Sequence, residues 1–335
     1  MASYTIYSVT EQPVTHHLWE GGELETVAVV FERPEVLSMR SLALIAPTDS
    51  DIVVDVAWSG ISTGTERLLF TGRMPPFPGL DYPLVPGYES VGRVRTAGPT
   101  SGRTEGELVF VPGARCYTDA RGLFGGAARH LIVPGTRATP LADSLGDHAA
   151  LLALAATAQH AIAAGAVPDL IIGHGALGRL LARLALIADP SRAPTVWETN
   201  PIRATGNVGY DVVHPDTDPR RDYRAIYDVS GDPDLIDTLV MRLAPGGEIC
   251  LAGFYERPVH FAFPPAFLRE ARFRIAAEWK DTDLTAVAAM ASAGTLSLDG
   301  LITHRVPATA AASAYETAFT DPHCVKMILD WRQLS

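Results

Sequence analysis

The sequence predicts an α/β protein of two domains, in which a β-barrel is joined to a doubly wound parallel sheet. Three observations carry this prediction. A glycine-rich turn links a short apolar strand to a helix near residue 173, strands alternate with helices over 170–278, and short strands separated by Pro and Gly fill 25–148. Alternating strands and helices are typical of a parallel sheet, whereas closely spaced short strands are typical of a barrel.

The glycine turn is the most informative stretch of the chain. The apolar run 170–172 is followed by Gly173, Gly175 and Gly178, and then by a helical pattern of leucines. Gly173 permits a tight turn, Gly175 lets the backbone approach a pyrophosphate, and Gly178 lets the helix pack closely on the strand. The sequence therefore predicts a dinucleotide site at this turn.

The acid expected on the cofactor ribose is Glu198, which ends a second short strand 20 residues past Gly178. This is the spacing found in dinucleotide-binding βαβ units. A 2′-phosphate would meet the charge of Glu198, so NAD is favoured over NADP, although the nearby Arg203 leaves NADP open. The free N–H groups at the start of the helix, at Ala176 and Leu177, would face the phosphates.

The remaining elements are expected in the following order. In the barrel, strands are expected within 25–31, 42–46, 51–62, 90–98, 106–113 and 129–135. Beyond it, a buried helix is expected within 149–167, a helix within 235–243, and strands within 195–197, 210–213, 225–231, 246–254 and 272–279. The tail is expected to rejoin the barrel through 301–304 and a helix over 321–331. Residues 1–24 are expected to be an additional N-terminal arm.

Composition excludes several classes of protein. The 335 residues carry a formal net charge of −11 and contain no run of Lys and Arg, which argues against nucleic acid and anionic membrane partners. The longest weakly polar stretch is broken by polar residues, so no membrane span is expected, and no secretion signal is visible. Three scattered cysteines predict a reducing cytoplasm rather than a disulfide framework.

Four segments resemble the medium-chain dehydrogenase/reductase superfamily: 59–66, 85–94, 155–162 with the glycine turn, and 302–307 with the Ala-Tyr-Glu and Val-Lys-Met that follow it. The resemblance implies a GroES-like β-barrel catalytic domain over 25–148 and 287–335, and a Rossmann NAD-binding domain over 149–286. The third segment contributes Thr157 to the expected cofactor site. Ser230, Gly231 and Gly253, at expected strand ends, either border the nicotinamide ribose or are simple turns.

Zinc alcohol dehydrogenases of this superfamily carry a Cys in the first of these segments, a His in the second, and a Cys or acid four residues before the threonine of the third. The matching positions here hold Ser62 or Thr63, Tyr88 and Ala153. A hydroxyl, a phenol and a methyl group do not form a tetrahedral zinc site. The four-cysteine structural zinc lobe has no counterpart in this sequence either. Of the family's Gly-His-Glu motif at this point, the Glu is kept as Glu89. The sequence therefore predicts no bound metal.

Without a metal, the removal of an alcohol proton falls to side chains. Tyr88, beside Glu89, is expected to act either as an acid/base or as a hydrogen-bond donor. Thr65 matches the proton-relay hydroxyl of the superfamily, and Ser62 or Thr63 would orient the substrate oxygen. These five residues form the expected catalytic group.

The run 53–94 most closely resembles the branch of the superfamily that works in bacteriochlorophyll synthesis. That resemblance implies oxidation of the 3-(1-hydroxyethyl) group of bacteriochlorophyllide a, or of the related chlorophyllide, to 3-acetyl, with NAD accepting the hydride. A flat apolar tetrapyrrole needs a wide aromatic slot. The candidate lining residues are Trp58, Phe70, Phe77, Tyr82, Phe124 and Tyr255.

Two other functions fit the same residues. A zinc-independent, NAD(P)H-dependent enone or quinone reductase would share every nucleotide-binding residue, and assay direction and substrate would distinguish it. A non-catalytic nucleotide-binding protein could have kept the fold and lost the metal site, and cofactor reduction by the purified protein would exclude it. The sequence allows a homodimer but does not specify one.

Overall fold

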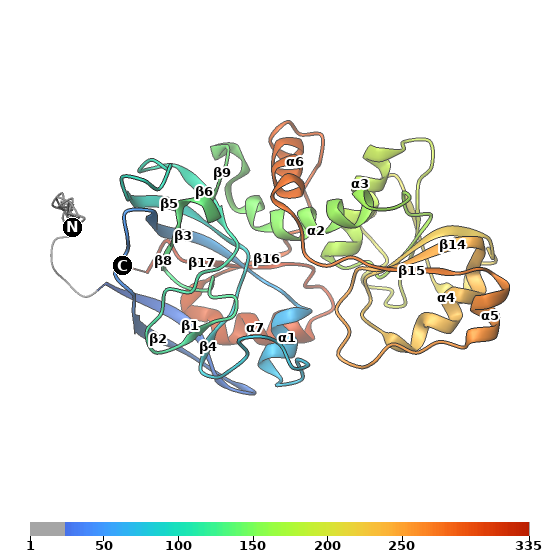
Figure 1. Cartoon of the computed structure of the whole chain (residues 1–335), viewed down its shortest axis with the longest axis horizontal. Helices are drawn as coiled ribbons and strands as arrows, with labels where there is room; N and C mark the ends of the chain where they lie inside the picture. The colour runs from blue at the N-terminus through green and yellow to red at the C-terminus, as the bar shows by residue number, and fades with distance from the viewer. Residues whose placement is uncertain (1–23, 335) are drawn as a thin grey trace, which may run out of the picture.

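The β-barrel half of the molecule contains two sheets. The computed structural model describes residues 24–334, so the arm expected at 1–24 lies outside the described residues except for Leu24. One sheet has the strand order β2-β1-β4-β7 and the other β16-β17-β3-β5-β6-β9, with β8 paired to β3. The strands are β1 (Glu25–Arg33), β2 (Val36–Ala43), β3 (Asp51–Ile61), β4 (Leu84–Val85), β5 (Ser90–Ala97), β6 (Leu108–Val111), β7 (Arg121–Gly122), β8 (His130–Pro134), β9 (Thr139–Pro140), β16 (His304–Pro307) and β17 (Met327–Asp330). The helices α1 (Thr65–Phe70) and α7 (Ala311–Thr320) belong to the same half of the molecule, as Figure 1 shows.

The other half is a six-stranded parallel sheet in the order β12-β11-β10-β13-β14-β15. Its strands are β10 (Leu170–Ile172), β11 (Thr195–Trp197), β12 (Asp211–Val213), β13 (Tyr223–Asp228), β14 (Leu243–Leu251) and β15 (Arg272–Ile275). Its helices are α2 (Leu152–Ala163), α3 (Ala176–Ala188), α4 (Ile236–Arg242), α5 (Phe263–Leu268) and α6 (Asp281–Ser292), as Figure 1 shows. The α/β fold class is therefore confirmed.

Helices cover both faces of this parallel sheet. In β10, Ile171 packs into the core that contains α2, α3 and α6, whereas Leu170 and Ile172 pack into the core that contains α4. Successive residues of a strand point to opposite faces, so a short run buried on both sides must be apolar throughout. This requirement explains why β10 consists of Leu-Ile-Ile.

Two expected elements differ from the structure. The helix expected over 321–331 is wrong, because this segment is a turn followed by β17, which pairs antiparallel with β3. Its apolar run is short, and tertiary strand pairing decided its conformation. The strand expected at 42–46 instead ends at Ala43, because Ala43 pairs with Glu25, the first residue of β1, and Leu44 forms only an isolated bridge with Tyr117. The return of the tail to the barrel is confirmed by the β17–β3 pairing, and it is visible in Figure 1.

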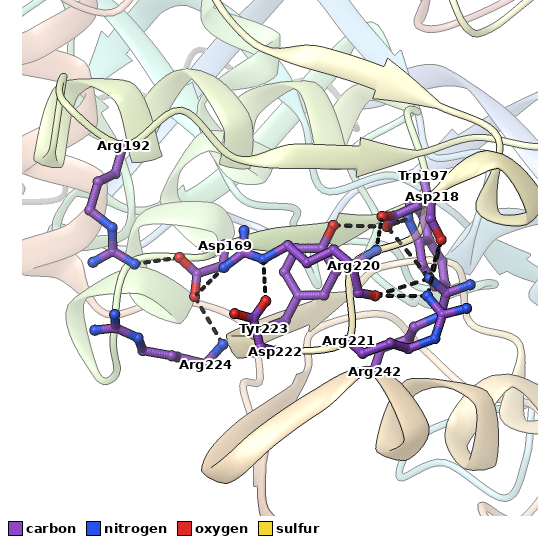
Figure 2. Close-up of polar contacts among 10 residues, drawn as sticks. All are labelled: Asp169, Arg192, Trp197, Asp218, Arg220, Arg221, Asp222, Tyr223, Arg224 and Arg242. Atoms are coloured by element: carbon purple, nitrogen blue, oxygen red, sulfur yellow. Dashed lines mark hydrogen bonds and ion pairs between the residues drawn. The ribbon is translucent and has the colours of Figure 1, made fainter.

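A polar cluster connects the segments that flank β10, β11 and β13. Figure 2 shows its two buried aspartates. Asp218 accepts hydrogen bonds from Trp197 Nε1 at 2.7 Å and from the Tyr223 hydroxyl at 2.8 Å, while Asp169 accepts from the Arg224 backbone N–H at 2.9 Å. Buried carboxylates are tolerated when they are hydrogen-bonded in this way. Among the described residues, none of the helices combines the length and apolar character that a membrane crossing requires.

Candidate active site and cofactor site

The glycine turn has the geometry that a bound pyrophosphate requires. Gly173 has φ 103°, and a Cβ on Gly178 would lie 1.9 Å from the Gly173 carbonyl oxygen, so both positions need glycine. A Cβ on Gly175, the N-cap of α3, would meet no atom within 4 Å. Ala176 and Leu177 open the helix directly behind this free space. The unpaired backbone N–H groups of the first helical turn are thus available to an anion.

Glu198 follows β11 directly and is held by two backbone N–H groups. Its carboxylate accepts from His174 at 3.1 Å and from Asn200 at 2.8 Å, which orients it beside the glycine turn. Arg203, the residue that left NADP open, donates through Nε to the Pro322 carbonyl at 3.1 Å. Its guanidinium is therefore anchored to the C-terminal tail.

Two residues that the sequence reasoning missed fix the loop that follows Glu198. The imidazole of His174 bridges the Arg203 carbonyl at 2.6 Å and the Tyr210 hydroxyl at 2.8 Å, and burial lowers its pKa to about 4. The buried Arg179 donates to carbonyl groups of the 203–206 loop. The signal that could have revealed them is an imidazole in the glycine turn and a guanidinium in the buried first turns of an otherwise largely apolar helix.

Ser230, Gly231 and Gly253 gather at the carboxyl ends of β13 and β14. A Cβ on Gly253 would lie 3.1 Å from the Gly231 backbone nitrogen. Ser230 is exposed, and its hydroxyl donates to the buried Asp228 carboxylate at 2.6 Å. Thr157, on α2, donates its hydroxyl to the Ala153 carbonyl at 3.0 Å.

The expected catalytic hydroxyls come together around Tyr88. The phenol donates to Ser62 Oγ at 2.8 Å, and the Thr65 side chain lies close enough to lower the pKa of the phenol. Thr63 is half-buried on the same loop, and it is Ser62 that accepts from the phenol. Burial, and then the neighbouring Glu89, raise the pKa of Tyr88 far above its usual range. The phenol therefore stays protonated.

Behind Tyr88, Glu89 forms a buried ion pair with Lys326. The lysine ammonium lies 2.8 and 2.5 Å from the two carboxylate oxygens and 3.3 Å from the Ile61 carbonyl oxygen, and both side chains are fully enclosed. A Cβ on Gly60 would lie 2.0 Å from Glu89 Oε2, so the pair fits only against glycine. Lys326 was missed as a functional residue, although a lone lysine inside an otherwise apolar run is a usable signal.

A second buried carboxyl, Glu66, lies beneath the same loop. It accepts from the Ser62 backbone N–H at 3.0 Å and from the Tyr315 hydroxyl at 2.6 Å, and none of its surface is exposed. Burial raises the pKa of Glu66 to about 7. Glu66 and Tyr315 were also missed, because they lie 249 residues apart in the chain.

Two of the aromatic candidates continue from the Tyr88 ring. Phe124 packs edge-on against Tyr88 with ring centroids 5.4 Å apart, and Phe77 packs on Phe124 at 6.2 Å. Trp279, in the segment after β15, adds a third ring 6.4 Å from Tyr88 and was not expected. An apolar aromatic wall therefore adjoins the hydroxyl group.

The other four aromatic candidates have different contacts. Phe70 packs on Phe31 in the barrel core, and Tyr82 donates to the Leu69 carbonyl. Trp58 lies under Arg332 at 5.0 Å and lines a separate cavity of about 400 Å³, and Tyr255 donates to Asp228 at 2.7 Å. None of these contacts involves Tyr88.

The residues that the sequence resemblance matches to zinc ligands, Ser62 or Thr63, Tyr88 and Ala153, do not fit that metal here. Ser62 and Tyr88 are bonded to each other, and Ala153 is a buried methyl group on α2. Among residues 24–334, no three His, Cys, Asp or Glu side chains gather as a metal set. These side chains lack the thiolate, imidazole and carboxylate ligands that zinc takes.

Comparisons with known proteins agree with this architecture. Residues 48–143 match the alcohol dehydrogenase GroES-like domain. An alcohol dehydrogenase (rspB) of Escherichia coli CFT073 complexed with NADH has a TM-score of 0.78 at 19% identity, covering 92% of this chain and 100% of that one. A dehydrogenase of Sinorhizobium meliloti 1021 bound to NADP has a TM-score of 0.76 at 18% identity, with the same coverage. Both likenesses show the fold.

A sequence relative of Rhodobacter capsulatus is much more similar. The 2-desacetyl-2-hydroxyethyl bacteriochlorophyllide A dehydrogenase of that organism is 58% identical over 312 residues, which is 92% of this chain and 99% of the relative. This chain therefore belongs to the 2-desacetyl-2-hydroxyethyl bacteriochlorophyllide A dehydrogenase family, within the medium-chain dehydrogenases.

Proposed function

We propose that this protein oxidises the hydroxyethyl side chain of a bacteriochlorophyllide, or of the related chlorophyllide, to an acetyl group with NAD as hydride acceptor. Family membership at 58% identity supports the substrate. The observation that carries the chemistry is the 2.8 Å hydrogen bond from Tyr88 to Ser62, at the position where related enzymes hold a metal. This hydroxyl pair is the candidate site for the substrate oxygen.

The chain's own residues supply a path for the alcohol proton. Because the pKa of Tyr88 is raised, a free tyrosinate is not the base. The phenol can instead accept the alcohol proton while it passes its own to Ser62 Oγ, and Ser62 in turn releases its hydroxyl proton to solvent water near the half-buried Thr65. Glu89 is already paired with Lys326, so it compensates the charge of the lysine ammonium and does not exchange the alcohol proton.

When bound, the nicotinamide ring supplies the hydride acceptor, and this chain's residues hold and orient it. The backbone around Gly173, Gly175 and Gly178 would hold the pyrophosphate, and Gly231 and Gly253 would border the nicotinamide ribose. Glu198 can accept from the adenosine ribose hydroxyls through the lone pairs that His174 and Asn200 leave free. The negative charge of Glu198 and the anchored Arg203 favour NAD over NADP.

The aromatic wall suits a flat pigment better than a sugar alcohol. Phe124, Phe77 and Trp279 adjoin Tyr88. An apolar macrocycle gains free energy against such rings, whereas a polyol would lose hydrogen bonds there. The catalytic domain is proposed to comprise 25–148 and 287–335, and the cofactor domain 149–286. A cytoplasmic location is also proposed, because the three cysteines are buried and form no disulfide.

A homodimer through β15 is also proposed. This strand ends the parallel sheet, and Phe273 and Ile275 on it are 36% and 77% exposed. A free strand edge beside apolar side chains can pair with the same edge of a second copy about a two-fold axis.

The reaction can be followed by the red absorption band of the pigment, since a new acetyl carbonyl extends the conjugation of the macrocycle. Purified protein with hydroxyethyl bacteriochlorophyllide and NAD should shift this band while NADH accumulates in equal amount. Turnover of a simple enone or quinone with no shift of the pigment band would favour a reductase instead.

A further inference from the structure

The buried group behind the hydroxyl pair contains two carboxyls and one ammonium. Glu66, Glu89 and Lys326 are all enclosed, and Lys326 bonds only to Glu89 among the acids. If both acids are ionised, one negative charge stays uncompensated in a dry environment, which is costly. One acid of this group should therefore exchange a proton readily.

Glu66 is the acid without a cationic partner. Its contacts are the Ser62 backbone N–H, from the loop before α1, and the Tyr315 hydroxyl, from α7. The charged and titratable groups facing it are Glu89, Lys326, Tyr315 and Tyr88. Burial raises the pKa of Glu66 to about 7, so this carboxyl changes charge near neutrality.

The charge of Glu66 affects the hydroxyl pair above it. An ionised Glu66 raises the pKa of the Tyr88 phenol, and its carboxylate holds the backbone of Ser62, the acceptor of that phenol. A nearby negative charge favours protonated groups. An ionised Glu66 therefore makes the Tyr88–Ser62 pair a better acceptor for the alcohol proton, and a neutral Glu66 makes it a poorer one.

We propose that Glu66 is a positioning residue whose charge, set jointly with Glu89 and Lys326, controls how readily the Tyr88–Ser62 pair accepts the alcohol proton. Oxidation is then faster when Glu66 is ionised, and the reverse reduction is faster when it is neutral. Tyr315 sets the pH at which Glu66 ionises, because its hydroxyl donates to the ionised carboxylate and lowers the pKa of Glu66. This inference rests on the proposed dehydrogenase function.

The test is the pH profile of kcat for oxidation of hydroxyethyl bacteriochlorophyllide with saturating NAD. The unmodified protein should show an inflection near pH 7. Glu66→Gln keeps an acceptor for Ser62 but cannot ionise, so the inflection should disappear and turnover above it should fall by up to about tenfold, the equivalent of one pKa unit in the acceptor. Tyr315→Phe should move the inflection to higher pH. Glu248→Gln, which alters a carboxylate paired with Arg274 in the cofactor domain, is the matched control and should leave the profile unchanged.

Infrared difference spectra across neutral pH provide a second readout that needs neither pigment nor cofactor. A protonated carboxyl band should appear as the pH falls through 7 and should be missing in Glu66→Gln. Persistence of the band or of the kinetic inflection in Glu66→Gln would overturn the inference. Absence of any pigment turnover in the unmodified protein would instead overturn the proposed function, so the two failures are distinguishable.

Discussion

The Tyr88 hydroxyl donates to Ser62 Oγ at 2.8 Å. Tyr88→Phe removes the hydroxyl and keeps the ring that packs on Phe124. We expect kcat for pigment oxidation to fall by roughly 100-fold, as for loss of an acid/base group, while NAD affinity stays unchanged.

Steady-state kinetics combined with NAD titration separates these two effects. Dialysis of the unmodified protein against a zinc chelator should leave kcat unchanged and serves as the control. An equal loss of NAD affinity in Tyr88→Phe would show that the phenol supports cofactor binding rather than proton transfer.

The raised pKa of Glu66 also predicts that the free energy of unfolding depends on pH. Burial raises its pKa from 4.5 to about 7, so the folded state favours the protonated carboxyl. This stabilisation is fully present below pH 4.5 and is lost as the pH rises through 7, a change of roughly 3 kcal/mol. Urea unfolding should find Glu66→Gln more stable than the unmodified protein by up to about this amount near pH 8, with little difference near pH 5. A gap of equal size at both pH values would show that Glu66 does not titrate as described.

Glu198→Ala tests the cofactor assignment. Removing the carboxylate should weaken the binding of NAD by about tenfold or more, because hydrogen bonds to a charged group are lost. The difference in affinity between NAD and NADP should therefore become smaller. Fluorescence titration of both cofactors measures this gap. A parent protein that already binds NADP more tightly than NAD would contradict the assignment.

Much of the cofactor domain was predictable because its signals are local. The turn from Gly173 to Gly178 and the strand ending at Glu198 lie within about thirty residues, and each glycine has its own steric reason. The 321–331 segment was mispredicted because a short apolar run is compatible with either a helix or a strand, and only the pairing of β17 with β3 decides.

The buried charges of the candidate active site could not be derived from local patterns. Lys326 and Glu89 are 237 residues apart, and Tyr315 and Glu66 are 249 apart. Their pairing depends on the return of the tail to the barrel, so the sequence indicates the individual residues but not their contacts. The closeness of Tyr88 and Ser62 was expected only through the resemblance to metal-binding relatives.

The free edge of β15 predicts the oligomeric state. Ile275→Lys places a charge on this exposed strand and should convert a dimer to a monomer. Ile45→Lys is the matched control, because Ile45 is 43% exposed in the other domain. Sedimentation equilibrium should show a dimer for the parent and the control only. A monomeric parent, or a dimer that survives Ile275→Lys, would exclude β15 as the interface.

The most direct measurement of the proposed function is the red absorption band of hydroxyethyl bacteriochlorophyllide during incubation with purified protein and NAD. We expect a progressive shift of the band to that of the acetyl pigment, with one NADH formed per pigment converted. Ethanol and sorbitol should give no NADH, because an unactivated aliphatic alcohol is poorly served by a phenol and a hydroxyl in place of a metal. An unshifted pigment band, together with reduction of an enone or quinone by NADH or NADPH, would contradict the proposed oxidation of the hydroxyethyl group.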